Sequence, residues 1–575
     1  MLLTYRLMAE VLAQWVIALT AIAGVGWTVE MALKRNKDAG SYLETLWLGL
    51  GGITSVMYAL NLFTGLVGWQ MKILISCFIA LGARDLSRFE FLKTLRKRRI
   101  TKLDICLGVF AAATTLLLMN LSIGSGQKGD SSVYHIGLVD YAAKYSVIPG
   151  LANLHSRFGF NSTTYQLSAV FQNGLWGVEG FRLANGFICV LVLLEVVKRI
   201  RKIVRSGYGD VSDYILLLGL NIVVYSAIWI PNTAISSPNP DLPAALMLLV
   251  AITYSSSAFL KGGNMEYGLA FSLAVLSFTF RPLTAPLVIF LFVLLVKRTL
   301  ISKRIDRLLV ITVGMASFLI LMVVLRSIII SGYVYYPSTF RLDRLDWAVP
   351  KSSAEIDLKA IEAWAKTPSV PYEQVLQSNS WVSGWISRWK QYFLLPSITI
   401  VIGCLVLVIA ARYNLKELFH QAPTKLISVV LISILFWGYS APDPRFAVGL
   451  VAVVIALPAS WGLTLLSDCR LSKFSVAHVA LLSIIGAQFS YIALTPTYPY
   501  STLLNKASER FDSGLVPFQG APTKSVVLES GLVIQIPTED GGCFRIEMCT
   551  IGVNSMNEGL VLRGTDITDG FRIKD

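Results

Sequence analysis

The sequence predicts an all-α polytopic membrane protein with about 14 transmembrane helices. Three observations support this fold class. The chain is 54% hydrophobic and only 15% charged, whereas soluble domains carry roughly 25% charged residues. Apolar runs of about 20 residues, the length that spans a bilayer, recur along the chain. Basic residues gather in the short segments between those runs, as is typical of cytoplasmic loops.

The predicted spans are apolar runs with few charges, and three of them are short for a full crossing. We expect each short run to be buried among neighbouring helices or to continue into the next run. The predicted set is 12–29, 44–66, 70–83, 103–122, 180–197, 212–230, 242–259, 266–280, 283–297, 308–330, 392–411, 425–439, 446–466 and 474–493.

The basic segments predict the orientation of these spans. If every basic segment is cytoplasmic, the spans alternate without contradiction and both termini lie outside the cytoplasm. The net charge of +15 is then a topology signal and a contact with anionic lipid, so nucleic acid is not an expected partner. The segments are "LKRNK" at 33–37, "LKTLRKRRITK" at 92–102, "VKRIRKIVR" at 197–205 and "VKRTLISKRIDR" at 296–307, with smaller groups at 412–425 and 470–473.

Two domains follow from this pattern. Residues 1–493 form a transmembrane module with large outer loops at 123–179 and 331–391, and residues 494–575 form a small outer tail. The alternation in "SVVLESGLVIQIP" predicts β-strands in the tail. Cys543 and Cys549 are disulfide candidates, because an oxidising compartment permits such a bond.

Both outer loops contain apolar segments. "STTYQLSAVFQNGLWGVEGF" at 162–181 is predicted to be a helix that lies in, or dips into, the outer membrane interface. Trp381, Trp385 and Trp389 are spaced to share one helix face. They are interpreted as an interfacial anchor, or as a wall against a lipid substrate.

The first outer loop contains "GDSSVYH", with Asp130, Tyr134 and His135. A partly desolvated carboxylate at a membrane surface is a candidate general base with a raised pKa. The alternative for Asp130 is a helix N-cap. Further on, "NLHSRFGF" contributes His155 and Arg157 after Asn153, and arginine can bind a phosphate through two hydrogen bonds.

Three more charged residues stand at predicted outer helix ends. Asp241 in "SPNPDLP" begins a span, where the helix dipole alone would stabilise it. Arg281 in "FTFRPLT" interrupts apolar sequence, and an arginine without a partner is costly there. Arg445 follows Asp443 in "APDPRF"; a structural salt bridge between the two is one interpretation, although i, i+2 spacing does not pair two side chains on an α-helix. Together these acids and arginines predict a site for a phosphate-bearing lipid.

The pattern resembles the GT-C superfamily of integral-membrane glycosyltransferases. The hallmark of that superfamily is an acidic residue in the first large outer loop, matched here by Asp130, with a second outer acid matched by Asp241. The resemblance implies a GT-C-like fold and a polyprenyl-phosphate sugar as donor. It also implies arginines that contact the lipid phosphate, as Arg281 and Arg445 would.

"PGLANLHSRFGFNS" also resembles a stretch in a poorly characterised family of bacterial polytopic membrane proteins, which implies the bacterial inner membrane. The usual GT-C first-loop motif is a paired acid, whereas this sequence reads "GDSSVYH". We therefore expect no cofactor, with Mg²⁺ or Mn²⁺ as the alternative.

The expected function is transfer of a sugar from a polyprenyl-phosphate donor to an outer glycan or lipid acceptor, with inversion. Asp130 would act as the base, positioned by His135. The substrate-binding group would comprise Tyr134, Asn153, His155, Arg157, Asp241, Arg281 and Arg445. The alternatives are a polysaccharide polymerase or ligase that uses a diphosphate-linked lipid oligosaccharide, and a flippase or transporter of lipid-linked sugars.

Overall fold

The protein is described by a computed structural model. It covers residues 2–32, 42–88, 100–124, 129–229, 235–302, 307–390, 424–468, 521–539, 542–551 and 559–574, and parts of 392–405. The basic segments at 33–37 and 470–473, most of those at 92–102 and 412–425, the predicted span 474–493 and residues 494–520 lie outside the described residues.

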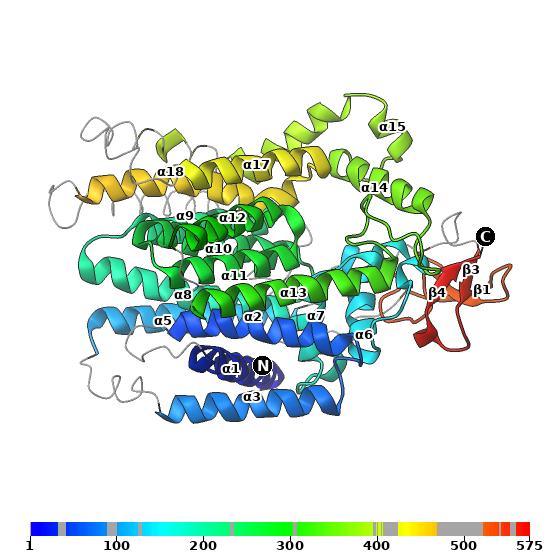
Figure 1. Ribbon diagram of the computed structural model, residues 1–575, viewed down its shortest axis with the longest axis horizontal. Helices are drawn as coiled ribbons and strands as arrows, with labels where there is room; N and C mark the ends of the chain where they lie inside the picture. The colour runs from blue at the N-terminus through cyan, green and yellow to red at the C-terminus, as the bar shows by residue number, and fades with distance from the viewer. Residues whose placement is uncertain are drawn as a thin grey trace.

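The chain is mostly helical, as predicted, and its long helices run side by side (Figure 1). The short helices α6, α7 and α14 gather with the strands at one end of this bundle, on the right in Figure 1; we call it the loop end. The helices are α1 (Leu2–Ala32), α2 (Tyr42–Asn61), α3 (Trp69–Arg88), α5 (Lys102–Ile123), α6 (Ile136–Lys144), α7 (Thr163–Phe171), α8 (Leu183–Ser206), α9 (Val211–Trp229), α10 (Asp241–Lys261), α11 (Asn264–Phe280), α12 (Ala285–Ser302), α13 (Arg307–Ser331), α14 (Lys351–Lys366), α15 (Tyr372–Leu376), α17 (Thr424–Ser440) and α18 (Val448–Asp468).

Within the described residues, 8 segments are long and apolar enough to cross a membrane. Three shorter apolar helices, in α9, α11 and α17, accompany them. The total of about 14 spans stays a prediction. The 8 segments are Tyr5–Ala32, Tyr42–Asn61, Lys102–Ile123, Gly177–Ser206, Asp241–Lys261, Pro282–Ile301, Leu309–Ser331 and Pro444–Thr464.

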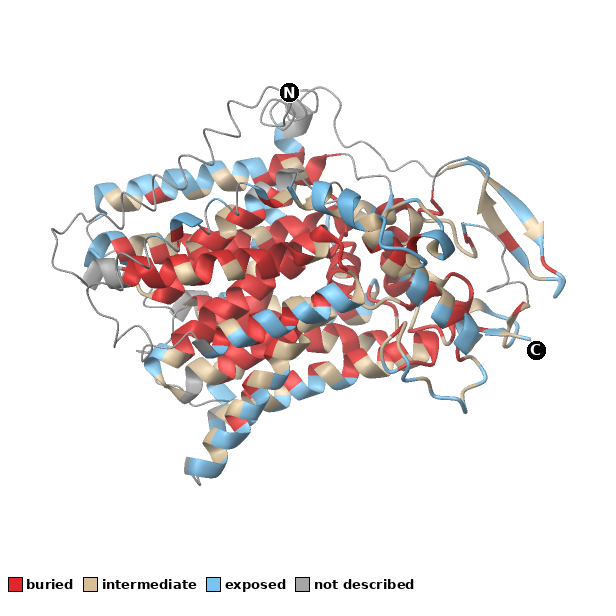
Figure 2. Cartoon of the chain, turned by 90° about the horizontal axis from the view of Figure 1, so that it is seen from above, coloured by how far each residue is buried: buried red, intermediate tan, exposed pale blue. Residues whose placement is uncertain are grey.

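Burial differs sharply between the inner and the outer helices (Figure 2). The span in α10 is 94% buried, whereas those in α5 and α12 are 28% and 22% buried. The outer helices expose large apolar side chains, such as Val109 at 64% and Ile289 at 63%. An apolar surface of this extent is typical of contact with lipid.

Glycines allow α1 to approach its neighbours closely. A Cβ at Gly49 of α2 would lie 1.8 Å from the carbonyl oxygen of Ile22, and one at Gly82 of α3 would lie 2.1 Å from that of Thr20. Only glycine fits such contacts, which are common between membrane helices.

Short helical turns connect the helices at the loop end: η1 (Ser131–His135), η2 (Leu151–Asn153), η3 (Ser156–Gly159), η4 (Gly177–Arg182), η5 (Pro282–Thr284) and η6 (Pro444–Ala447). The interfacial helix predicted over 162–181 is instead two elements, α7 and η4. Residues 163–169 are all buried, so α7 is packed against neighbouring parts of the chain.

The predicted strands in the tail are confirmed. Strands β1 (Thr523–Val527) and β2 (Val533–Pro537) form an antiparallel hairpin, with Val526 opposite Ile534. Gly531 adopts φ 81° in the connecting turn, a conformation that favours glycine. Strands β3 (Leu560–Leu562) and β4 (Phe571–Ile573) form a second antiparallel pair.

Candidate functional site

Asp130 and Arg445 form an ion pair at the loop end, although 315 residues separate them in the sequence. Arg445 Nη1 donates to Asp130 Oδ2 at 3.1 Å. Asp130 immediately precedes η1, the π-helical turn before α6, and Arg445 lies in η6 before α18. The side chains are 29% and 14% exposed, so the pair is partly accessible.

Arg445 has a second carboxylate partner, Asp443. The backbone N–H of Arg445 donates to Asp443 Oδ1 at 3.0 Å, and Arg445 Nε lies 3.4 Å from Asp443 Oδ2. The salt bridge that the sequence left open is therefore present. The α-helical spacing argument against it does not apply, because Asp443 is the N-cap of a 3-10 turn and its side chain folds back over that turn.

Arg281 forms an ion pair with Asp241 Oδ1. This carboxylate is the partner that an arginine amid apolar sequence needs. Arg281 links α11 to η5, and Asp241 is the first residue of α10. In the loop before α10, the Asp241 N–H donates to Asn239 Oδ1 at 2.8 Å. Asp241 Oδ2 and Arg281 Nε are buried without a hydrogen-bond partner among the described residues.

The ring of Phe446 connects the two ion pairs. The guanidinium carbon of Arg281 lies 4.1 Å from the ring centre, and that of Arg445 lies 4.8 Å from it. Both distances are within the range of cation–π attraction. Two positive charges from separate helix ends are therefore held beside one aromatic ring.

Tyr134 and His135 pack behind this charged group. Their rings are 4.3 Å apart, and the His135 ring is 5.4 Å from that of Tyr165. His135 is 1% exposed, and burial lowers its pKa to about 3, so the imidazole is neutral at physiological pH. The charges that act on the Tyr134 phenol are those of Asp130, Arg157, Arg281 and Arg445.

The pKa of Asp130 is lowered, so the predicted raised pKa was wrong. Burial alone raises the pKa of this carboxyl group, but the interactions with Arg445, His135 and Arg157 together outweigh that effect. Asp130 also makes no side-chain hydrogen bond to η1, so it does not act as the N-cap that was the alternative interpretation. The carboxylate is ionised, and Arg445 is its strongest counter-charge.

Arg157 lies beside Asp357 of α14, a residue that the sequence analysis missed. Arg157 Nη2 is 3.6 Å from Asp357 Oδ1, and Ser156 Oγ donates to the same oxygen at 3.1 Å. The Arg157 guanidinium also lies 5.2 Å from the centre of the Phe160 ring. Asp357 shares the buried face of an amphipathic helix with Ala354, and an acid on an apolar face was the signal that could have identified it.

His155 and Asn153 have other contacts. His155 caps η3 by accepting the Arg157 N–H at Nδ1, at 3.1 Å, and burial lowers its pKa to about 3. Asn153 Nδ2 donates to the carbonyl oxygens of Trp347, at 2.8 Å, and Phe571, at 3.4 Å. None of these hydrogen bonds within the described chain reaches Asp130 or an arginine side chain, so the contacts favour structural roles.

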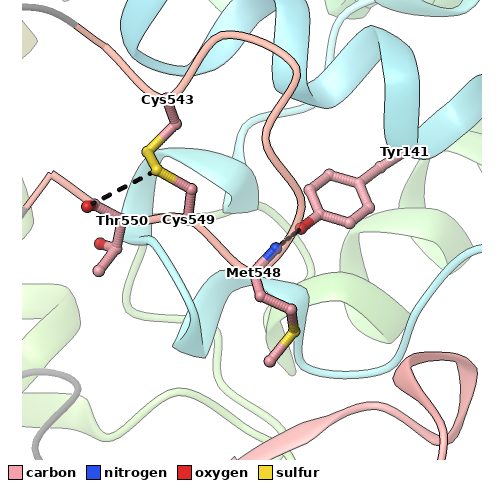
Figure 3. The surroundings of a disulfide bond; sticks show 5 residues. All are labelled: Tyr141, Cys543, Met548, Cys549 and Thr550. Atoms are coloured by element: carbon pink, nitrogen blue, oxygen red, sulfur yellow. Dashed lines mark hydrogen bonds between the residues drawn. A yellow bond between two sulfur atoms is a disulfide. The ribbon is translucent and has the colours of Figure 1, made fainter. Parts of the chain in front are cut away.

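The tail docks on the helix that carries Asp130 and His135. Cys543 and Cys549 are joined by a disulfide, and the tail residues between them contact η1 and α6. Phe544 N–H donates to the Ser132 carbonyl oxygen at 2.8 Å. Met548 N–H donates to the hydroxyl of Tyr141 at 3.2 Å (Figure 3). Two charged contacts add to these, Lys144–Glu547 at 2.7 Å and Arg545–Glu179 at 3.0 Å.

The predicted tryptophan face packs against the turn that carries Arg445. The Trp385 ring is stacked 5.5 Å from that of Trp389, and both lie about 6 Å from Trp437, at 6.1 and 5.9 Å. Trp385 Nε1 donates to the Pro442 carbonyl oxygen, and Trp437 Nε1 donates to that of Asp443 at 3.0 Å. The indoles therefore help to position the Asp443 turn.

Sequence analysis also missed two groups of buried charge. Arg326 of α13, 2% exposed, donates to Asn61 Oδ1 at 3.3 Å and to Asn161 Oδ1 at 3.0 Å. Glu195 and Arg199 of α8 lie among other buried polar groups, and Arg199 is 3.0 Å from Asp213. A charged residue inside an apolar run was the signal in both cases.

In the part of the chain that the structure describes, no three His, Cys, Asp or Glu side chains are grouped to hold a metal ion.

A family model described as a domain of unknown function, DUF8201, matches residues 8–452. The chain belongs to this family. The match includes every predicted site residue, from Asp130 to Arg445, and ends before the tail. No curated protein and no solved structure matches the chain.

Proposed function

We propose that this family member is a membrane glycosyltransferase that moves a sugar from a polyprenyl-phosphate donor to a hydroxyl acceptor. The observation that carries the proposal is the contact between Asp130 and Arg445, with Arg281 held beside Arg445 by Phe446. An acid that can accept a proton and two arginines that can bind a phosphate thus lie side by side.

The lipid part of the donor suits the surroundings of these residues. The apolar spans that lead to the loop end expose apolar side chains, so a polyprenyl chain would stay in the bilayer while its phosphate reaches the arginines. Guanidinium groups bind phosphate oxygens through paired, charge-assisted hydrogen bonds. Arg157, 25% exposed, adds a third positive charge near Tyr134.

The proposed reaction is a single displacement. The acceptor hydroxyl attacks the anomeric carbon of the sugar, and its proton passes to the Asp130 carboxylate. The bond between that carbon and the phosphate oxygen breaks, and its electron pair leaves with the polyprenyl phosphate. Arg281 and Arg445 stabilise the negative charge that develops there. Attack from the opposite face inverts the anomeric configuration, and the buried, neutral His135 supports Asp130 from behind.

The proposed location follows from the distribution of basic segments along the chain. We propose a bacterial inner membrane, about 14 spans and both termini outside the cytoplasm, because basic segments are typical of the cytoplasmic side. The loop end then faces outward, where an acceptor glycan or lipid of the cell envelope would be available.

The test uses the purified full chain in proteoliposomes with a panel of undecaprenyl-phosphate sugars and mixed glycan acceptors. We expect donor consumption and an inverted product. The variant Asp130→Asn should lower kcat by at least about a hundredfold, since general base catalysis contributes that much. The control is Asp343→Asn, an outer-loop aspartate that is 80% exposed, and it should retain wild-type turnover.

Other outcomes would contradict the proposal. Full turnover by the Asp130→Asn variant would exclude this residue as the base. Consumption of diphosphate-linked oligosaccharides alone would indicate a polymerase or ligase. Movement of the intact donor between leaflets, without bond cleavage, would indicate a flippase.

A further inference from the structure

We propose that the two carboxylates that bind Arg445 have different roles: Asp443 holds the guanidinium group permanently, and Asp130 is an exchangeable counter-ion that the donor phosphate displaces. This inference rests on the proposed function, and it adds an order of events to it. Asp130 becomes available as a base only after the anionic donor has occupied Arg445.

Asp443 is fixed in place by several contacts. Its side chain caps η6 through the Arg445 N–H, and its carbonyl oxygen accepts the hydrogen bond from Trp437 Nε1 at 3.0 Å. The side chain is 7% exposed. Departure of this carboxylate would also remove the cap of the turn that carries Arg445, so a ligand replaces Asp443 less readily than Asp130.

Asp130 is held much less firmly. Its side chain is 29% exposed and makes no capping hydrogen bond to the turn that it begins. Its hydrogen bond to Arg445 reaches a segment 315 residues away in the sequence. Unlike the hydrogen bond of Asp443, it does not cap the turn that carries Arg445. Asp130 can therefore swing away while Arg445 stays oriented by Asp443 and by the ring of Phe446.

A phosphate is a strong competitor for this position. It offers several oxygens to a guanidinium group, and Arg281 contributes a second positive charge across the Phe446 ring. Once displaced, Asp130 loses the attraction of Arg445 and gains the repulsion of the phosphate. Both changes make the carboxylate a better proton acceptor. Binding of the donor would thus activate the base next to the sugar that is to be transferred.

The test compares two isosteric variants that remove one negative charge each from the same arginine. Undecaprenyl phosphate in nanodiscs and inorganic phosphate in solution serve as separate probes, and Kd is measured for the full chain. Asp130→Asn should bind the lipid probe more tightly, by up to about fivefold, since a partly exposed ion pair of up to about 1 kcal/mol no longer competes. Asp443→Asn should bind it about tenfold more weakly, because the Arg445 guanidinium group loses the charge of its orienting partner.

The decisive result is that the two substitutions change Kd in opposite directions. Weaker binding by both variants would overturn the inference, because Asp130 would then be an orienting partner like Asp443. If Asp443→Asn does not fold, Asp443→Ser removes the charge and keeps a capping hydroxyl, and the same loss of binding is expected. Opposite changes with both probes indicate a site for any phosphate, whereas opposite changes with the lipid probe alone indicate a lipid headgroup.

The two proposals can fail separately. If the two variants change Kd in opposite directions but no sugar is transferred, the displacement stands and the glycosyltransferase proposal is refuted. If sugar is transferred but both variants change Kd in the same direction, the displacement is refuted and the glycosyltransferase proposal stands. A wild-type chain that binds neither probe would overturn both.

Discussion

The guanidinium group of Arg281 lies over the ring of Phe446, 4.1 Å from its centre, and that of Arg445 lies 4.8 Å from the same centre. The geometry leads to a first prediction. Phe446→Leu keeps an apolar side chain but removes the aromatic face for both arginines. Each cation–π contact is worth about 0.5–2 kcal/mol. Two such contacts together are worth about 1–4 kcal/mol, so we expect the Kd for undecaprenyl phosphate to rise by at least about fivefold.

The control for this substitution is Phe446→Tyr, which retains the ring and should bind the probe as the wild type does. Equal affinity of Phe446→Leu and Phe446→Tyr would show that the ring only fills space. Binding in nanodiscs measures both variants under the same conditions.

The second prediction concerns acid stability. Burial lowers the pKa of His135 and of His155 from 6.5 to about 3. Between these values the unfolded chain binds protons that the folded chain does not. Each imidazole therefore contributes stability that is complete above pH 6.5 and is lost as the pH falls toward 3, by about 1.4 kcal/mol per pH unit.

The variant His155→Asn tests this slope, because an amide oxygen can replace Nδ1 as the cap of η3. The unfolding free energy of the variant between pH 7 and pH 5 should depend less on pH than that of the wild type. An unchanged slope would mean that His155 titrates normally in the folded chain.

A third prediction separates structure from substrate binding at Asn153. Its side-chain amide joins the 331–391 loop to β4, so Asn153→Ala should cost about 1–3 kcal/mol of stability. KM for the donor should not change. Asn379→Ala, an exposed residue in the same outer loop, is the control for the thermal shift. A raised KM with unchanged stability would restore Asn153 to the substrate-binding group.

The fourth prediction concerns the disulfide. Replacement of both Cys543 and Cys549 by serine should release the docked tail residues from η1 and α6, since closing a short loop contributes about 2 kcal/mol. Amide hydrogen exchange of residues 131–144 should then become faster. The matched control replaces Cys77 and Cys106, two exposed free thiols on α3 and α5, and should leave that exchange unchanged. Equal protection in both double variants would show that the disulfide does not stabilise this contact.

Much of the fold could be predicted because membrane helices follow from local composition. Apolar run length predicted α2, α5, α10 and α18 to within a few residues. The alternation of side chains predicted strands β1 and β2 in the same way. The charged residues at helix ends were also recognisable, because an acid or arginine is rare in such surroundings.

The pairing of those charges could not be predicted in the same way. The partners Asp130 and Arg445 depend on which helices pack together, and no local pattern contains that information. The direction of the Asp130 pKa shift depended on that partner and was therefore wrong in the sequence analysis. Asp357 was missed because its role arises only when α14 folds back onto Arg157.

The docking of residues 542–550 on η1 and α6 has a consequence for biogenesis. These residues follow, in order of synthesis, every helix that supplies an acid or an arginine to the candidate site. A chain released early by the ribosome would contain all those side chains but not the segment that braces α6. Nascent protein would therefore gain this contact only after translation of the tail and formation of the Cys543–Cys549 disulfide, which would delay any reaction at the candidate site until assembly is complete.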